Sequence, residues 1–221
     1  MKLFFDAVVK FVCGVLLVGL LLFLPAGTLY YPQGLLFSAA LFIPIFFMGI
    51  VLFVKQPELL KKRLNNKEKE TTQKGVVAVS GLIFIVGFVL AGLDFRFGWT
   101  KVPVAVTIIA VMLFLFSYIV LAFVLRQNEY LSRTVEVQEN QKVVDTGLYG
   151  VVRHPMYMAT ILMFLSMPLI LGSWVSFIVF LVYPAVIAIR IKNEEKVLSE
   201  QLEGYSEYQQ KVKYKIIPFI W

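Results

Sequence analysis

Apolar residues run in six long stretches along the chain, separated by polar or turn-rich segments. The stretches cover residues 7–25, 34–54, 76–93, 102–125, 157–172 and 174–189. A helix needs about 20 predominantly apolar residues to cross the hydrocarbon core of a bilayer, and the last two stretches are short by this measure. Only Gly172 and Ser173 separate those two, which predicts a tight turn and a helical hairpin. The pattern predicts an all-α polytopic integral membrane protein with about six transmembrane helices.

The composition of the chain supports a membrane location. Of its 221 residues, 59% are hydrophobic and only 16% are charged, with a mean hydropathy of +0.81. Soluble domains carry about a quarter charged residues, so this composition excludes an ordinary soluble protein. The first apolar stretch follows Lys2 and Lys10, as in a signal peptide, but it lacks a small-residue cleavage site, and we expect it to be retained.

The positive charges indicate the orientation in the membrane. Nineteen of the 21 lysine and arginine residues lie in the two terminal segments and in the polar segments after the second and fourth stretches, whereas only Arg96 and Lys101 lie in the opposite turns. Cytoplasmic loops carry such an excess, so both termini and the two long polar segments are predicted to be cytoplasmic. The formal charge of +7 is explained by anionic lipid headgroups beside these segments, and we expect no nucleic-acid partner.

The polar segment 55–74 contains Leu59, Leu60 and Leu64, whose spacing predicts a short amphipathic helix lying on the membrane. We expect no metal site in the chain, because its only histidine, His154, and its only cysteine, Cys13, have no neighbours at metal-ligand spacing.

The chain divides into two regions of different character. Residues 1–125 are expected to form a four-span membrane scaffold, and residues 126–221 a polar loop, the membrane hairpin and a C-terminal cytoplasmic helix. The polar connection 126–156 is much longer than a helix–helix turn needs, and such loops are usually functional or disordered. Its segment 146–150 reads as a compact turn, and Pro155 suits the first position of the next helix.

The last apolar helix is expected to continue out of the membrane to about Leu202. Arg190 and Glu194 are four residues apart and share a face of that helix. A charged pair where a membrane hairpin emerges is a candidate functional site. The tyrosine-rich tail, with Tyr205 and Tyr208, is expected to anchor at the membrane interface.

These motifs have a recognisable arrangement. The pattern Gly147-x-Tyr149-x-x-x-Arg153-His154-Pro155-x-Tyr157, a hairpin, Arg190-x-x-x-Glu194-Glu195 and a tyrosine-rich tail with Pro218 resembles the isoprenylcysteine carboxyl methyltransferase family and its relatives among the phospholipid N-methyltransferases. The resemblance covers about residues 126–221 and implies a methyltransferase that uses S-adenosyl-L-methionine. It implies catalytic roles for Arg190 and Glu194, with Arg190 facing the methyl acceptor. It places cofactor contacts on Gln138, Gln141, Lys142, Val143, Val144, Gly147, Tyr149, Arg153, His154, Pro155, Met156, Tyr157, Glu194 and Glu195.

The residue types suit this chemistry. A sulfonium cofactor calls for a carboxylate, cationic or N–H donors and an aromatic surface, which Glu194, His154 and Tyr149 or Tyr157 supply. A carboxylate acceptor is already ionised at neutral pH and needs no base, and Arg190 would hold it by paired hydrogen bonds. An amine acceptor must lose a proton, and Glu195 or His154 would then be the base.

We expect carboxyl methylation of a prenylcysteine-like or other lipophilic acceptor that enters from the bilayer, with phospholipid amine methylation as the alternative. Two further readings remain. The tail Lys215-Ile216-Ile217-Pro218-Phe219 is similar to the end of sterol reductases, which use NADPH, and a non-catalytic membrane protein would keep the hairpin as scaffold. The combination of arginine, histidine, tyrosine and glutamate favours the methyltransferase.

Overall fold

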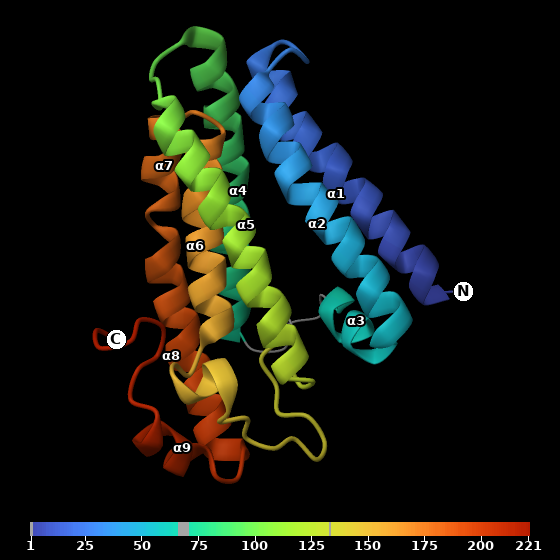
Figure 1. Cartoon of the computed structure of the whole chain (residues 1–221), viewed down its shortest axis with the longest axis vertical. Coiled ribbons are helices and arrows are strands. Elements are labelled where there is room, and N and C mark those ends of the chain that lie inside the picture. The colour runs from blue at the N-terminus through green and yellow to red at the C-terminus, as the bar shows by residue number, and fades with distance from the viewer. Residues whose placement is uncertain (1, 66–70, 133) are drawn as a thin grey trace.

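The computed structural model describes residues 2–65, 71–132 and 134–221, and within them it is helical with no strand (Figure 1). Lys67, Lys69 and Arg133, which entered the charge count, lie outside the described residues. The helices are α1 Lys2–Ala26, α2 Pro32–Lys55, α3 Pro57–Leu64, α4 Thr71–Phe97, α5 Val104–Gln127, the 3₁₀ helix η1 Gly147–Gly150, α6 Pro155–Ile170, α7 Trp174–Phe180, α8 Tyr183–Gln201 and α9 Tyr205–Lys211.

The helices confirm an all-α polytopic membrane protein. Among the residues that the structure describes, five helical segments are long and apolar enough to cross a membrane: α1, α2, α4, α5 and the combined segment of α7 and α8. The sixth apolar helix, α6, has 16 residues and is shorter than these. All six apolar stretches of the sequence are therefore helical, and α6 is the one whose length falls short of a full span.

The hydrophobic core lies where α2, α4, α5 and α7 meet, with Phe37, Phe88, Phe114 and Phe180 buried at its centre. By contrast, α1 and α2 expose most of their apolar side chains, as helices that face lipid do. They diverge from the other helices toward the end of the bundle that carries α3 (Figure 1). Gly92 allows α4 to approach α1, because a Cβ atom there would lie 2.5 Å from the carbonyl oxygen of Leu22.

The hairpin differs in one respect from the sequence prediction. The last apolar helix was expected to run without a break from residue 174, but the structure divides it into α7 and α8 at Leu181 and Val182. Pro184 lies in the first turn of α8. A proline has no N–H group to donate to the preceding turn, so the helix restarts there. The predicted turn at Gly172, whose φ is 80°, and the end of α8 near Leu202 are confirmed.

A buried carboxylate ties the hairpin turn to α4 at the end of the bundle away from α3 and α9. Asp94 is 1% exposed, and its Oδ1 atom accepts a hydrogen bond of 2.7 Å from the backbone N–H of Thr100. The hydroxyls of Thr100 and Ser173 both donate to its Oδ2 atom. This cluster fixes the position of the α6–α7 turn against α4 and the start of α5.

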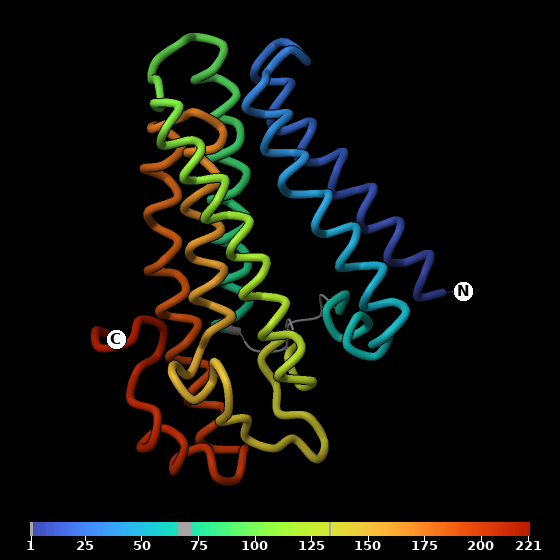
Figure 2. Tube along the Cα trace, viewed as in Figure 1, coloured from blue at the N-terminus to red at the C-terminus, as the bar shows by residue number. Residues whose placement is uncertain are grey.

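The polar elements gather at the other end of the bundle, where α3, α9 and the C-terminus lie with the loop that follows α5 (Figure 2). The predicted short amphipathic helix is confirmed as α3, with Leu59 and Leu60 buried. It contacts that loop and the start of α6. Lys62 Nζ donates to the Glu129 carbonyl at 3.3 Å, and Arg63 Nη1 lies 3.6 Å from the sulfur of Met156.

Candidate active site

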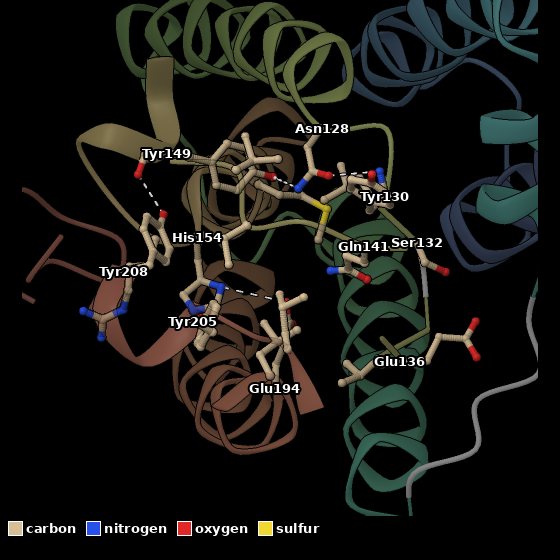
Figure 3. A pocket seen from close by; sticks show the side chains of 18 of the residues that line it. Asn128, Tyr130, Ser132, Glu136, Gln141, Tyr149, His154, Glu194, Tyr205 and Tyr208 are labelled. Atoms are coloured by element: carbon tan, nitrogen blue, oxygen red, sulfur yellow. Dashed lines mark hydrogen bonds and ion pairs between the residues drawn. The ribbon is translucent and has the colours of Figure 1, made fainter. Parts of the chain in front are cut away.

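A pocket opens between the loop after α5, the start of α6 and the helices α8 and α9 (Figure 3). The residues that line it come from four separate segments of the chain. They are Asn128, Tyr130, Leu131, Ser132, Thr134, Val135, Glu136, Gln141, Lys142, Val143, Val144, Tyr149, Arg153, His154, Met156, Tyr157, Arg190, Glu194, Leu198, Leu202, Tyr205 and Tyr208.

Glu195 is at the centre of an ion-pair cluster that includes two lining residues of this pocket, Arg153 and His154. Its Oε1 atom lies 2.7 Å from Arg153 Nε and 3.1 Å from His154 Nε2, and its Oε2 atom lies 2.7 Å from Lys215 Nζ. Arg153, His154 and Glu195 are all buried. Because three donors engage this carboxylate, Glu195 links α8 to the start of α6 and to the C-terminal tail.

The backbone of the C-terminal tail completes this link. The N–H groups of Arg153 and His154 donate to the carbonyls of Tyr214 at 2.9 Å and Lys215 at 2.8 Å. The Nη1 atom of Arg153 also donates to the carbonyl of Val212 at 2.7 Å. As predicted, Pro155 begins α6, where its missing N–H leaves no hydrogen bond unmade. The tail thereby holds Arg153 and His154 at the pocket.

Tyr157 links the two charged residues of α8. Arg190 Nε donates to the Tyr157 hydroxyl at 2.7 Å, and that hydroxyl donates to Glu194 Oε2. Tyr157 and Arg190 are buried, whereas the side chain of Glu194 is 22% exposed and reaches the pocket. His154 Nδ1 lies 4.0 Å from Glu194 Oε1. The pocket therefore presents a guanidinium and a carboxylate that share one phenol as a hydrogen-bond partner.

Hydrogen bonds to Tyr149 fix the position of the turn before α6. Asn128 Nδ2 donates to the Tyr149 hydroxyl at 3.1 Å, and the Tyr208 hydroxyl donates to the Tyr149 carbonyl at 2.7 Å. Burial raises the pKa of Tyr149 to about 12, so its hydroxyl is neutral at physiological pH. Gly147 begins the predicted compact turn, now seen as η1, with a φ of 59°. A Cβ atom there would lie 2.3 Å from the side-chain Nε2 atom of Gln127.

The structure brings most of the proposed site residues together. Those that line the pocket are Gln141, Lys142, Val143, Val144, Tyr149, Arg153, His154, Met156, Tyr157, Arg190 and Glu194. Gln138, Gly147, Pro155 and Glu195 lie outside its lining. The Gln138 backbone N–H donates to Gln141 Oε1 at 2.9 Å, so Gln138 supports the loop that carries Gln141.

Sequence reasoning missed two groups of lining residues. The first is the loop from Asn128 to Glu136, which precedes the motif. The second lies around α9: Tyr205 and Tyr208 were expected to anchor at the membrane interface, but they are buried and line the pocket, so that expectation was wrong. Their spacing of three residues, which places both on one helical face, was the available signal. Within the described ranges, no three histidine, cysteine, aspartate or glutamate side chains gather as a metal site would require.

Figure 3 shows how the labelled side chains are distributed around the pocket. His154, Tyr205 and Glu194 lie close together, and Tyr149 and Tyr208 lie beside them. Ser132, Gln141 and Glu136 lie on the other side, toward α4. The pocket thus has an aromatic side next to α9 and a polar side formed by the loop.

Comparison with known proteins agrees with this architecture. Residues 104–204 match the family described as phospholipid methyltransferase. The match runs from the start of α5 to the end of α8 and includes the loop, the hairpin and both Arg190 and Glu194. No curated protein matches the chain significantly. Residues 104–204 are therefore similar to the phospholipid methyltransferase family, to which the isoprenylcysteine carboxyl methyltransferases are related.

Proposed function

We propose that this membrane methyltransferase transfers a methyl group from S-adenosyl-L-methionine to the carboxylate of a prenylcysteine-like or other lipophilic acceptor. The observation that carries the proposal is the linked set Arg190, Tyr157 and Glu194 in one pocket. It offers a cation for an acceptor carboxylate and an anion for a cationic cofactor side by side.

The residues present fit the cofactor. Members of the phospholipid methyltransferase family generally use S-adenosyl-L-methionine. The carboxylate of Glu194 suits the positive groups of that molecule, and His154 suits its carboxylate. The apolar wall of Val143, Leu198 and Leu202 suits the flat adenine base. Bound there, the cofactor would supply a sulfonium methyl group: an acceptor carboxylate oxygen would bond to the methyl carbon as its C–S bond breaks, leaving S-adenosylhomocysteine, and no proton would have to be removed.

The loop is expected to move when the cofactor binds. The enclosed space of the pocket measures about 100 Å³, whereas small-molecule sites usually enclose about 300 Å³ or more. The helices around the pocket are held by the Glu195 cluster and by Tyr157. In the loop that follows α5, Tyr130, Gln138, Asn140 and Gln141 form hydrogen bonds with one another, so we propose that this part of the loop opens outward to admit the ligand.

The role of the protein groups is alignment. Methyl transfer is an in-line displacement, and correct placement of the reactants supplies much of the rate enhancement. Tyr157 orients Arg190, whose guanidinium is suited to hold a carboxylate by paired hydrogen bonds. The burial of Arg190 strengthens such a pair, because water is excluded around it.

The contacts of Glu195 argue against it as the base for an amine acceptor. Glu195 was one of two candidate bases for an amine acceptor, but Arg153, His154 and Lys215 already engage its carboxylate. This leaves His154 as the candidate base, and its Nε2 atom is paired with Glu195. A carboxylate acceptor needs no base.

Phospholipid amine methylation is the second candidate, because the matching family is described as phospholipid methyltransferase. The two candidates differ in product. A methyl ester is labile to base and releases methanol, whereas an N-methyl group is stable.

The deciding experiment is a transfer assay with methyl-labelled S-adenosyl-L-methionine, the purified full chain, a prenylcysteine panel and total lipid. We expect base-labile label in a prenylcysteine-like product and its loss in Glu194→Gln. Stable label in phosphatidylethanolamine would replace the first candidate with the second. Full activity of Glu194→Gln, or binding of NADPH without binding of S-adenosylhomocysteine, would contradict both.

We further propose that both termini and the pocket face the cytoplasm, with residues 1–125 as a scaffold along which the acceptor enters from the bilayer. The charge excess in the polar segments supports this. So does the position of α3, α9 and the C-terminus at one end of the bundle (Figure 1). A C-terminal reporter that is active only in the cytoplasm tests the orientation, and an inactive reporter on a folded chain would contradict it.

A further inference from the structure

The hydroxyl of Tyr205 is buried without a hydrogen-bond partner among the described residues. Its residue is 4% exposed and lines the pocket beside His154 (Figure 3). A buried hydroxyl without a partner destabilises a folded protein, and each such group in a native structure requires an explanation, such as strain, a bound water or a functional role. Because Tyr205 lines the pocket, a ligand bound there is the candidate partner of this hydroxyl.

Tyr205 differs from the neighbouring tyrosines Tyr149, Tyr157 and Tyr208, whose hydroxyls all have hydrogen-bond partners. The hydroxyl of Tyr208, one turn further along α9, donates to the Tyr149 carbonyl at 2.7 Å. The hydroxyl of Tyr149 accepts from Asn128, and that of Tyr157 is bonded to Arg190 and Glu194. Each of these phenols therefore supports the protein itself, and only the Tyr205 hydroxyl is left for a ligand within the part of the pocket that the structure describes.

Several contacts fix the position of Tyr205. Gly204 precedes it with a φ of 81°, a conformation that residues other than glycine rarely adopt. The Tyr205 and Tyr208 rings pack 5.7 Å apart between centroids, and Lys211 Nζ lies 2.6 Å from Asp145 Oδ2 at the end of α9. The hydroxyl is therefore held in place rather than turned toward water.

The surroundings indicate which part of a ligand this hydroxyl would meet. The Tyr205 ring belongs to an apolar cluster with Leu202, Tyr208, Val143 and Leu198. A flat, weakly polar base suits this wall, whereas the charged groups of a cofactor suit Glu194 and His154. Burial, followed by the charges of Glu195 and Glu194, raises the pKa of Tyr205, so its hydroxyl keeps its proton and can donate it.

We propose that the Tyr205 hydroxyl donates a hydrogen bond to an acceptor atom on the adenosine part of S-adenosyl-L-methionine. Tyr205 is thus a cofactor-binding residue contributed by α9, outside the motif and outside the residues 104–204 that match the family. The inference rests on the proposed function for the identity of the cofactor.

The test compares Tyr205→Phe with Tyr208→Phe in the purified full chain. Removing a hydroxyl that has no protein partner should leave the melting temperature of the ligand-free protein unchanged or higher, because a buried unpaired group is lost. The same change should raise the Kd for S-adenosylhomocysteine about 3- to 10-fold, as expected for one hydrogen bond. Tyr208→Phe should instead lower the melting temperature, because it breaks the bond to Tyr149.

The outcomes separate this inference from the proposed function. If the wild-type chain does not bind S-adenosylhomocysteine, the proposed function and the role of Tyr205 both fail. If it binds and Tyr205→Phe binds equally well, only the role of Tyr205 fails. A second ligand, methylthioadenosine, lacks the amino-acid part, and its Kd should rise by the same factor. A rise for S-adenosylhomocysteine alone would overturn the assignment to adenosine.

Discussion

The hydroxyl of Tyr157 on α6 donates a hydrogen bond to Oε2 of Glu194 on α8. The same hydroxyl accepts from Arg190 Nε at 2.7 Å. Two oppositely charged side chains of one helix are therefore connected through a phenol from the other arm of the hairpin. Their positions in the pocket depend on how α6 packs against α8, so the geometry of the site is sensitive to changes in the hairpin.

Tyr157→Phe should reduce transfer activity while leaving the chain folded. The change removes the group that orients both Arg190 and Glu194, and small misplacements of this kind lower rates by about 10- to 100-fold. We expect the loss mainly in kcat, measured with a saturating prenylcysteine acceptor. Tyr118→Phe is the matched control, because it removes a buried tyrosine bond to the Leu41 carbonyl at 3.0 Å away from the pocket. Equal losses in both variants would contradict an orienting role.

Glu195→Gln should destabilise the protein. The carboxylate engages Arg153, His154 and Lys215, and breaking a buried ion pair by removing one partner costs about 3–5 kcal/mol. Thermal unfolding in detergent should show a clearly lower midpoint, and a protease should cut the tail after Lys213 sooner. The matched control is Glu200→Gln on the exposed face of α8. An unchanged midpoint in Glu195→Gln would show that the cluster does not hold the tail.

Asp94→Ala should weaken the far end of the bundle without affecting the pocket chemistry. It leaves the Thr100 N–H and the Ser173 hydroxyl without the acceptor they share, at a cost of about 1–3 kcal/mol. The melting temperature should fall, while kcat per folded molecule should stay near that of the wild type. Asp6→Ala, at an exposed position of α1, serves as the control. A large loss of kcat at a temperature where the variant is folded would argue against this view.

The attachment of α9 should depend on acid pH. A hydrogen bond from Lys211 holds the pKa of Asp145 below its usual value of 3.8. A carboxyl whose folded pKa is lowered contributes stability above its unfolded pKa and loses it as the pH falls through the folded pKa. Hydrogen exchange of α9 should therefore be faster in Lys211→Met than in the wild type at pH 7, and the difference should shrink as the pH falls below 3.8 and through the lowered pKa of Asp145.

Lys213→Met is the control for this comparison, because its backbone carbonyl, not its side chain, contacts Arg153. It should exchange like the wild type at both pH values. A difference between Lys211→Met and the wild type that persists in acid would mean that the ion pair is not the cause.

Much of the fold follows from local sequence. Among the described residues, the apolar runs determine the five long membrane helices and the shorter α6, because length and hydropathy are properties of each segment alone. Pro155 sets the start of α6, and Gly172 permits the hairpin turn. Pro184 explains the break between α7 and α8 that the apolar pattern hides. The motif residues Arg190 and Glu194 were also visible in the sequence, although their catalytic roles remain a proposal.

Only the tertiary structure decided how these parts meet. Tyr157 forms hydrogen bonds with Arg190 and Glu194, which lie 33 and 37 positions further along the chain. The Arg153–Glu195 pair spans 42 positions. The burial of Tyr205 against the pocket depends on how α9 folds back onto the loop. Periodicity and spacing describe one segment at a time, whereas these contacts depend on packing between segments. Sequence therefore determined the helices and their charged residues, and packing decided which side chains form the pocket and which hold it together.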